Sequence, residues 1–122
     1  MERKDVKKLC ESLWREVVVR RAGCCEICQS RRNLHGHHVI PKSSGGLRAK
    51  FDPENGVCLC ADCHRYPHGN ADQRAVYFQS LRRAKGKLFY TDLQERYRQV
   101  DKVTTEELVE MSKVLLAELE AL

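Results

Sequence analysis

Four cysteines in two Cys-x-x-Cys pairs, Cys25/Cys28 and Cys60/Cys63, are the residues of this sequence best suited to bind a metal. Each pair lets two thiolates from one tight turn reach a single ion at about 2.3 Å, and two pairs complete a tetrahedron without an open position. The spacing therefore predicts a closed, structural zinc site. A redox dithiol in either pair, or chance clustering, is the alternative interpretation.

The other three cysteines do not share this spacing. Cys24 and Cys58 each lie close enough in sequence to replace a neighbouring ligand, but neither keeps the two-residue interval, so we expect small buried side chains there and at Cys10. The total of seven cysteines is odd, and the first residues are too charged for a secretory signal. Both features indicate a reducing, intracellular compartment, and we expect a cytoplasmic protein.

Histidines and an asparagine occupy the same part of the sequence. The doublet His37-His38 and Asn55 lie between the two cysteine pairs, and His64 follows the last cysteine directly. Imidazoles that the zinc site does not need can bind a second metal, and with an ordinary pKa of about 6.5 they can transfer protons near neutral pH. In an extended segment His37 and His38 point to opposite faces, so one can face a metal and the other a substrate.

The order of these motifs resembles the HNH, or ββα-metal, family of nucleases. The residues that carry the resemblance are His37, His38, Pro41, Arg48, Lys50, Asn55, His64 and His68, within a stretch from about Cys25 to His68. The resemblance implies an α+β fold with a small ββα-metal core, stapled by the four-cysteine zinc and flanked by N-terminal and C-terminal helices. It also implies metal-dependent hydrolysis of DNA that leaves 5′-phosphate and 3′-hydroxyl ends.

The resemblance assigns a second metal to histidines. It makes His37 and His64 ligands of a catalytic divalent ion, and imidazole accepts several such ions, so Mg²⁺, Mn²⁺, Ni²⁺ and Zn²⁺ all stay open. His68 has the separation from His64 that a third ligand has in colicin-type members of the family. Pro67 precedes it and can turn its ring away, so ligand and non-ligand interpretations both stay open.

The resemblance also assigns the catalytic residues. His38 is the general base that deprotonates the attacking water, and Asn55 ties down the loop and orients that base. An imidazole that must be aimed needs a partner for its other ring nitrogen, and an amide or a backbone carbonyl suits this purpose. Asn55 precedes Gly56, so a turn asparagine is the simpler interpretation of that residue alone. We expect His35 to be exposed or supporting.

Charge is uneven along the chain, whose net charge is +5. Residues 1–50 contain 12 Lys and Arg against 5 Asp and Glu, whereas residues 101–122 contain 2 against 6. A basic region of this kind suits phosphate contacts, although a merely solvated surface is the alternative. We expect Lys42, Arg48 and Lys50 to contact phosphate.

Helical periodicity and turn signals outline the remaining elements of a single domain, 1–122. Residues 4–22 are expected to form an amphipathic helix that ends at Gly23. Within the core, 24–70, residues 34–41 and 57–59 should pair as a short ribbon, and Pro67 should end a short helix that begins after Cys60.

Further helices should fill residues 71–122. Asn70 or Asp72 can cap the first of these helices, which should end at Gly86. Capping boxes introduce two more, at Thr91/Gln94 and Thr104/Glu107, the last helix spanning about 105–121. This last helix carries an apolar stripe that packs on the protein's own core or, alternatively, on a second copy in a weak homodimer: Leu108, Val109, Leu115, Leu116, Leu119 and Leu122.

The sequence thus favours a metal-dependent DNA endonuclease of phage or bacterial origin, with no membrane segment. Duplex, branched and single-stranded DNA, and also RNA, all stay open as substrates. Neither a helix-turn-helix nor tandem fingers are present to read sequence. The main alternative is a zinc-ribbon module that binds nucleic acid without catalysis. A thiol redox or zinc-sensing regulator is a third possibility, and it would require reactive cysteines.

Overall fold

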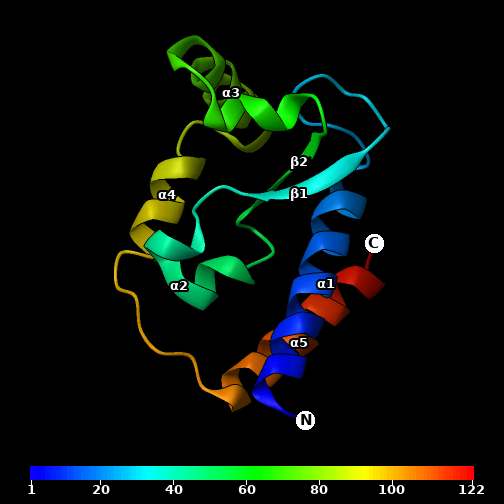
Figure 1. Ribbon diagram of the computed structural model, residues 1–122, viewed down its shortest axis with the longest axis vertical. Helices are drawn as coiled ribbons and strands as arrows, with labels where there is room; N and C mark the ends of the chain where they lie inside the picture. Colours follow the sequence, from blue (N-terminus) through cyan, green and yellow to red (C-terminus); the bar gives the residue numbers. More distant parts are fainter.

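The computed structural model describes residues 1–122, with a two-stranded antiparallel hairpin at the centre and helices on both sides (Figure 1). The elements in chain order are α1 (Arg3–Ala22), β1 (Leu34–His38), α2 (Lys42–Lys50), β2 (Gly56–Cys60), the 3-10 helix η1 (Cys63–His68), α3 (Ala71–Lys85), α4 (Phe89–Arg96) and α5 (Thr105–Glu120). None of these helices is both long and apolar enough to cross a membrane. The predicted α+β class is confirmed.

The hairpin separates two hydrophobic cores. Leu34 of β1 lies opposite Cys60 of β2, and His38 lies opposite Gly56. Every residue of β2 is buried, so both faces of this strand are covered. A ribbon of two strands is marginally stable alone in water, and packing on both faces compensates for that.

The first core lies between the hairpin, the cysteine loops, α3 and α4. Val57 and Leu59 of β2 are buried there, together with Leu81 of α3 and Leu93 of α4. Helix α3 begins at Asn70, whose side chain and that of Gln73 form a reciprocal capping box. Of the two expected caps, Asn70 and Asp72, the structure has Asn70.

The second core lies between the hairpin, α1 and α5. Gly36 and Gly56 have no side chains, and this lets Trp14 and Val18 of α1 lie directly on the strands. A Cβ atom added at Gly56 would stand 2.4 Å from Val18 Cγ2 and 3.0 Å from Trp14 Cζ2. The predicted N-terminal helix ends at Gly23, which adopts the left-handed conformation with φ of 72°.

Helices α1 and α5 lie side by side and run in the same direction (Figure 1). The Cys10 thiol donates to the Leu108 carbonyl oxygen at 3.4 Å, and Leu108 and Leu115 are fully buried. The apolar stripe of α5 therefore packs on the protein's own core, the first of the two alternatives that its pattern allowed. Leu116 and Leu122 of the same stripe stay 45% and 57% exposed.

Three local expectations differ from the structure. Residues 42–50, for which the sequence predicted no helix or strand, form α2, which kinks at Gly46 where φ is 68°. Helix α4 begins at Phe89 and has no side-chain cap. Phe89 packs on the first core, so the helix starts before Thr91. The predicted capping box at Thr91/Gln94 was therefore wrong. Pro67 lies inside η1 and does not end it, since the φ that its ring imposes is also that of a 3-10 helix.

The close approach of α1 to the hairpin predicts a specific cost for a methyl group at Gly56. We expect Gly56→Ala to lower the free energy of unfolding by about 1–3 kcal/mol, because overpacking forces α1 away from β2. Val18→Ala in the same chain removes the atom in closest contact and should recover part of that loss. Denaturant unfolding of the zinc-loaded single and double variants measures the coupling, and additive effects would contradict the packing described.

Candidate functional site

The four predicted cysteines converge at one end of the hairpin. The Sγ atoms of Cys25, Cys28, Cys60 and Cys63 all lie within 4.8 Å of one another. Cys28 Sγ and Cys60 Sγ are 3.7 Å apart. Sulfur atoms bound to one tetrahedral zinc at about 2.3 Å stand about 3.8 Å apart, so the group fits such an ion. The cluster can therefore bind a structural metal.

Backbone amides favour thiolates in this cluster. The Ile27 N–H donates to Cys25 Sγ and the Cys63 N–H to Cys60 Sγ, both at 3.4 Å. Burial alone would raise the pKa of the Cys25 thiol, but backbone hydrogen bonds outweigh it and lower the pKa to about 7. At Cys25 a metal therefore displaces a weakly held proton, whereas burial raises the pKa of the Cys63 thiol.

Glu26 connects the first cysteine turn to the rest of the core. Its Oε2 accepts a hydrogen bond from the Cys58 N–H at 2.7 Å, and its Oε1 pairs with Lys85 Nζ of α3 at 3.1 Å. Both side chains of the ion pair are mostly buried, at 14% and 19% exposed. One carboxylate thus joins the turn, β2 and α3, a role that the sequence analysis missed.

The other cysteines lie outside the cluster. Cys58 and Cys10 are fully buried in the second core, as expected, and burial raises the pKa of the Cys58 thiol to about 12. Cys24 is only half-buried, which differs from the expectation of a buried side chain. It does not join the cluster of four.

Three of the predicted histidines form a second group of donor atoms. His37, His64 and His68 each place a ring nitrogen within 4.8 Å of those of the other two. His37 Nδ1 and His64 Nε2 are 3.2 Å apart, which suits two nitrogens bound to one ion at about 2.1 Å. The 3-10 geometry of η1 keeps His68 in this group despite Pro67. These residues can therefore hold a metal.

The surroundings of His37 keep its imidazole neutral. Burial lowers its pKa to about 4, and the neighbouring His64 and His68 add to the effect through charge repulsion. A neutral imidazole is the form that binds a metal. Tyr77 contacts the ring of His37 edge-on, and its buried hydroxyl has no hydrogen-bond partner.

His38 lies on the opposite face of β1, as the strand alternation predicts. Its Nε2 lies 2.7 Å from the Lys50 carbonyl oxygen. Because a carbonyl only accepts, Nε2 carries the proton and Nδ1 keeps the free lone pair. Burial lowers the pKa of His38, against the opposing effect of the Lys50 carbonyl. The ring is therefore a neutral base of fixed tautomer.

Trp14 fixes the plane of the His38 ring, and the sequence analysis missed it. The two rings stack with centroids 3.8 Å apart and planes 5° from parallel. Trp14 Nε1 also donates to the Asp52 carbonyl oxygen at 2.7 Å. Trp14 occurs four residues after Cys10 and four before Val18, on the apolar face of the predicted helix. That periodicity could have placed it in the core, although not against a histidine.

Asn55 holds the loop, and its side-chain hydrogen bonds go to Ile40 and Ala49 and not to His38. It is fully buried, and its Nδ2 donates to the carbonyl oxygens of Ile40 at 2.8 Å and Ala49 at 2.7 Å. Its Oδ1 accepts from the Ile40 N–H at 2.8 Å. Asn55 thus joins the segment after β1 to the end of α2, while the Lys50 carbonyl orients His38.

The histidines open onto a common cavity of about 490 Å³, lined by His37, His38, His64 and His68 with Lys42. His35 does not line it and is exposed. Among the three residues expected to contact phosphate, only Lys42 lies at this cavity.

Arg48 and Lys50 lie elsewhere. Arg48 pairs with Glu107 and with Asp101, at 2.8 Å from Nε to Oδ1. Its charge is therefore balanced within the protein. Lys50 Nζ lies over the ring of Phe51, 5.6 Å from its centroid.

A comparison with protein families finds the model of the HNH endonuclease family over residues 25–69. The match covers the cysteine cluster, all five histidines and Asn55. The predicted resemblance is therefore confirmed for this stretch, which lies inside the longer chain. No curated protein and no solved structure matches the chain.

The cysteine cluster predicts that its zinc is required for folding. We expect Cys28→Ser to lose the tightly held zinc and to unfold the core, because the free energy of binding structural zinc is free energy of folding. Cys24→Ser is the matched control and should keep one such zinc per chain. Metal analysis with circular dichroism measures both, and a folded Cys28→Ser variant that retains its zinc would contradict the assignment.

Proposed function

We propose that this protein is a metal-dependent endonuclease that hydrolyses phosphodiester bonds of DNA, with His38 as general base. The proposal is carried by one observation: three histidines bring their donor atoms together at a cavity that a fourth, differently oriented histidine also lines. A structural zinc site needs only the four cysteines. The match of residues 25–69 to the HNH endonuclease family supports the same activity.

The residues His37, His64 and His68 would hold the divalent ion. Once bound, such an ion supplies Lewis-acid stabilisation of the charge that develops on the phosphate and the departing oxygen. Imidazole binds several first-row ions, so Mg²⁺, Mn²⁺, Ni²⁺ and Zn²⁺ are the ions to test. The low pKa of His37 suits the neutral ligand form at physiological pH.

His38 moves the proton. Its Nε2–H is committed to the Lys50 carbonyl, so Nδ1 accepts the proton of the attacking water. The water oxygen forms a bond to phosphorus, and the bond from phosphorus to the 3′-oxygen breaks. The 3′-oxygen takes a proton from solvent, which leaves 5′-phosphate and 3′-hydroxyl ends, and His38 returns its proton to solvent.

A positive charge at the histidine cavity can contact the phosphates of the substrate. Lys42 lies on its edge and can pair with a phosphate next to the scissile one. A module that binds nucleic acid through the zinc core without cleaving it is the alternative. Removal of His38 distinguishes the two, since binding alone does not need a base.

We expect His38→Ala to slow plasmid nicking by about 10²- to 10⁴-fold, with zinc content unchanged. Conversion of supercoiled plasmid in the presence of Mg²⁺, Mn²⁺ or Ni²⁺ measures the rate. His35→Ala is the matched control, because His35 is an exposed histidine of the same strand outside the cavity, and it should cut like the wild type. If wild-type protein nicks no faster than His38→Ala with any of these ions, the endonuclease proposal is wrong.

The stacked ring of Trp14 gives a second expectation. Trp14→Leu removes the ring that positions His38, whereas Trp14→Phe retains an aromatic plane. We expect kcat for nicking to fall in Trp14→Leu and to recover largely in Trp14→Phe, with little change in KM, because the ring orients the base and does not bind DNA. Equal kcat in the two folded, zinc-loaded variants would mean that Trp14 serves only the core.

A further inference from the structure

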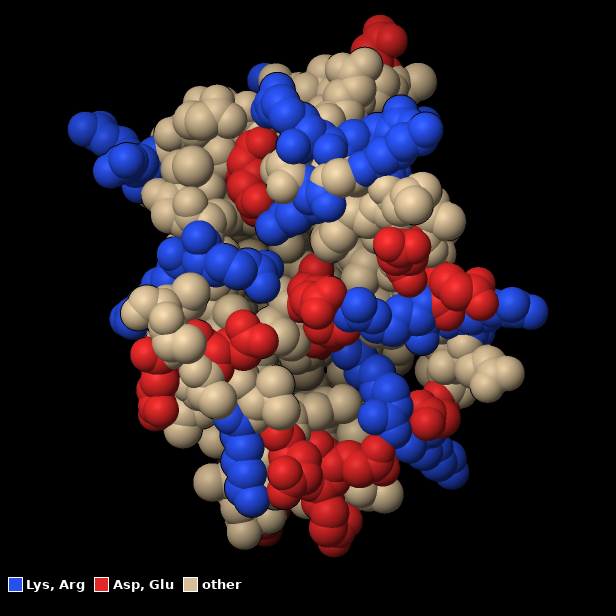
Figure 2. Space-filling view, turned by 180° about the vertical axis from the view of Figure 1, so that it is seen from behind, with Lys and Arg blue, Asp and Glu red and all other residues tan.

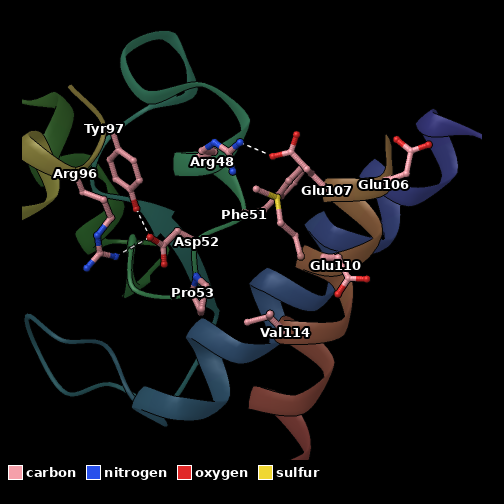
Figure 3. A pocket seen from close by; sticks show the side chains of 11 residues that line it. Arg48, Phe51, Asp52, Pro53, Arg96, Tyr97, Glu106, Glu107, Glu110 and Val114 are labelled. Carbon is pink, nitrogen blue, oxygen red and sulfur yellow. Dashed lines mark hydrogen bonds and ion pairs between the residues drawn. The ribbon is translucent and has the colours of Figure 1, made fainter. Parts of the chain in front are cut away.

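A second cavity, of about 620 Å³, lies between α5 and the segment that joins α2 to β2. It shares no lining residue with the histidine cavity. Figure 3 shows Asp52 and Pro53 on one side of it and Glu110 and Val114 on the other. Arg48 reaches across to Glu107 at one end.

Helix α5 presents a separate face to this cavity. Glu107, Glu110, Met111 and Val114 recur at intervals of three and four residues, so they share one side of the helix. This side differs from the apolar stripe that packs on α1. Val114 is 53% exposed, and the buried ring of Phe51 lines the cavity as well. Phe51 belongs to the second core and Met111 packs against it, so Val114 is the most exposed apolar side chain of a cavity that also carries acidic groups.

Acidic side chains outnumber basic ones at the cavity. Its lining contains the carboxylates of Asp52, Glu106, Glu107 and Glu110 against the guanidinium groups of Arg48 and Arg96. Both arginines are already paired, Arg48 with Asp101 and Glu107, and Arg96 with Asp52 and Glu54. Glu110 pairs with Lys113 at 3.1 Å on the exposed surface. Figure 2 shows acidic side chains gathered over the lower half of the rear face, which includes the beginning of α5.

This surface excludes two kinds of ligand. The excess of carboxylates over guanidinium groups disfavours the phosphate backbone of DNA here. The carboxylates do not converge on one point, since only the cysteine and histidine groups bring three donor atoms within 4.8 Å. A divalent cation therefore lacks a site in this cavity.

We propose that the cavity is a docking site for a basic segment of a partner protein. An apolar side chain of that segment packs on Met111 and Val114, while flanking Lys or Arg side chains pair with Glu106 and, in place of Lys113, with Glu110 at the exposed rim. Charge complementarity identifies the occupant, because an acidic cavity on a chain of net charge +5 favours a cationic partner over the chain's own substrate. The proposal is independent of nuclease activity.

A short capped peptide of Lys and Ala with one central Phe is the probe, added to the full zinc-loaded chain. We expect saturable changes in amide NMR shifts that are confined to residues 51–52, 96–97 and 106–114. The same peptide with Ser in place of Phe should bind about tenfold more weakly, since the apolar contact is lost. Absence of saturable binding, or shifts scattered over the surface, overturns the proposal.

Two double variants with the same change of net charge test the position of the site. Glu106→Gln with Glu110→Gln should weaken peptide binding about three- to tenfold. Glu118→Gln with Glu120→Gln, exposed near the other end of α5, should have a smaller effect. Equal losses in the two overturn the proposal. Sedimentation of the chain alone tests the other occupant: self-association that only the first pair weakens would assign the cavity to a second copy and contradict a separate partner.

Discussion

A ribbon of only two strands is barely stable in water, and the rest of this structure depends on that constraint. The hairpin is stable because a hydrophobic core lies on each of its faces. Strand alternation then separates neighbouring side chains, so His37 faces Tyr77 while His38 faces Trp14. The fold thus provides, in adjacent residues, two imidazoles with different surroundings.

The same burial determines the chemistry of these imidazoles. Removal from water disfavours the charged form, and it lowers the pKa of both His37 and His38. A neutral ring suits a metal ligand and a general base alike, although the two rings differ in their partners. His37 is grouped with other histidines, whereas His38 has an aromatic ring on one face and a backbone carbonyl at one nitrogen.

Features that depend on nearby residues could be predicted from the sequence. The two-residue interval of Cys25/Cys28 and the reciprocal caps at Asn70 and Thr104 are properties of single turns. Features that depend on tertiary contacts could not. The partner of Arg48 is a carboxylate more than fifty residues away, and the early start of α4 follows from the packing of Phe89. The stacking of Trp14 on His38 is of the same kind, because periodicity indicates burial without naming the neighbour.

Helix α2 ends with carbonyl groups that no later turn of the helix can satisfy. Two of them have side-chain partners, the Ala49 carbonyl with Asn55 and the Lys50 carbonyl with His38. The carbonyl end of a helix also carries partial negative charge, which favours a cation beside it. On the proposed mechanism, the imidazolium that forms when His38 takes its proton lies against this end. On that proposal, the Lys50 carbonyl in the last turn of α2 orients the base before proton transfer and stabilises its conjugate acid afterwards, against the opposing charge of the Lys50 side chain.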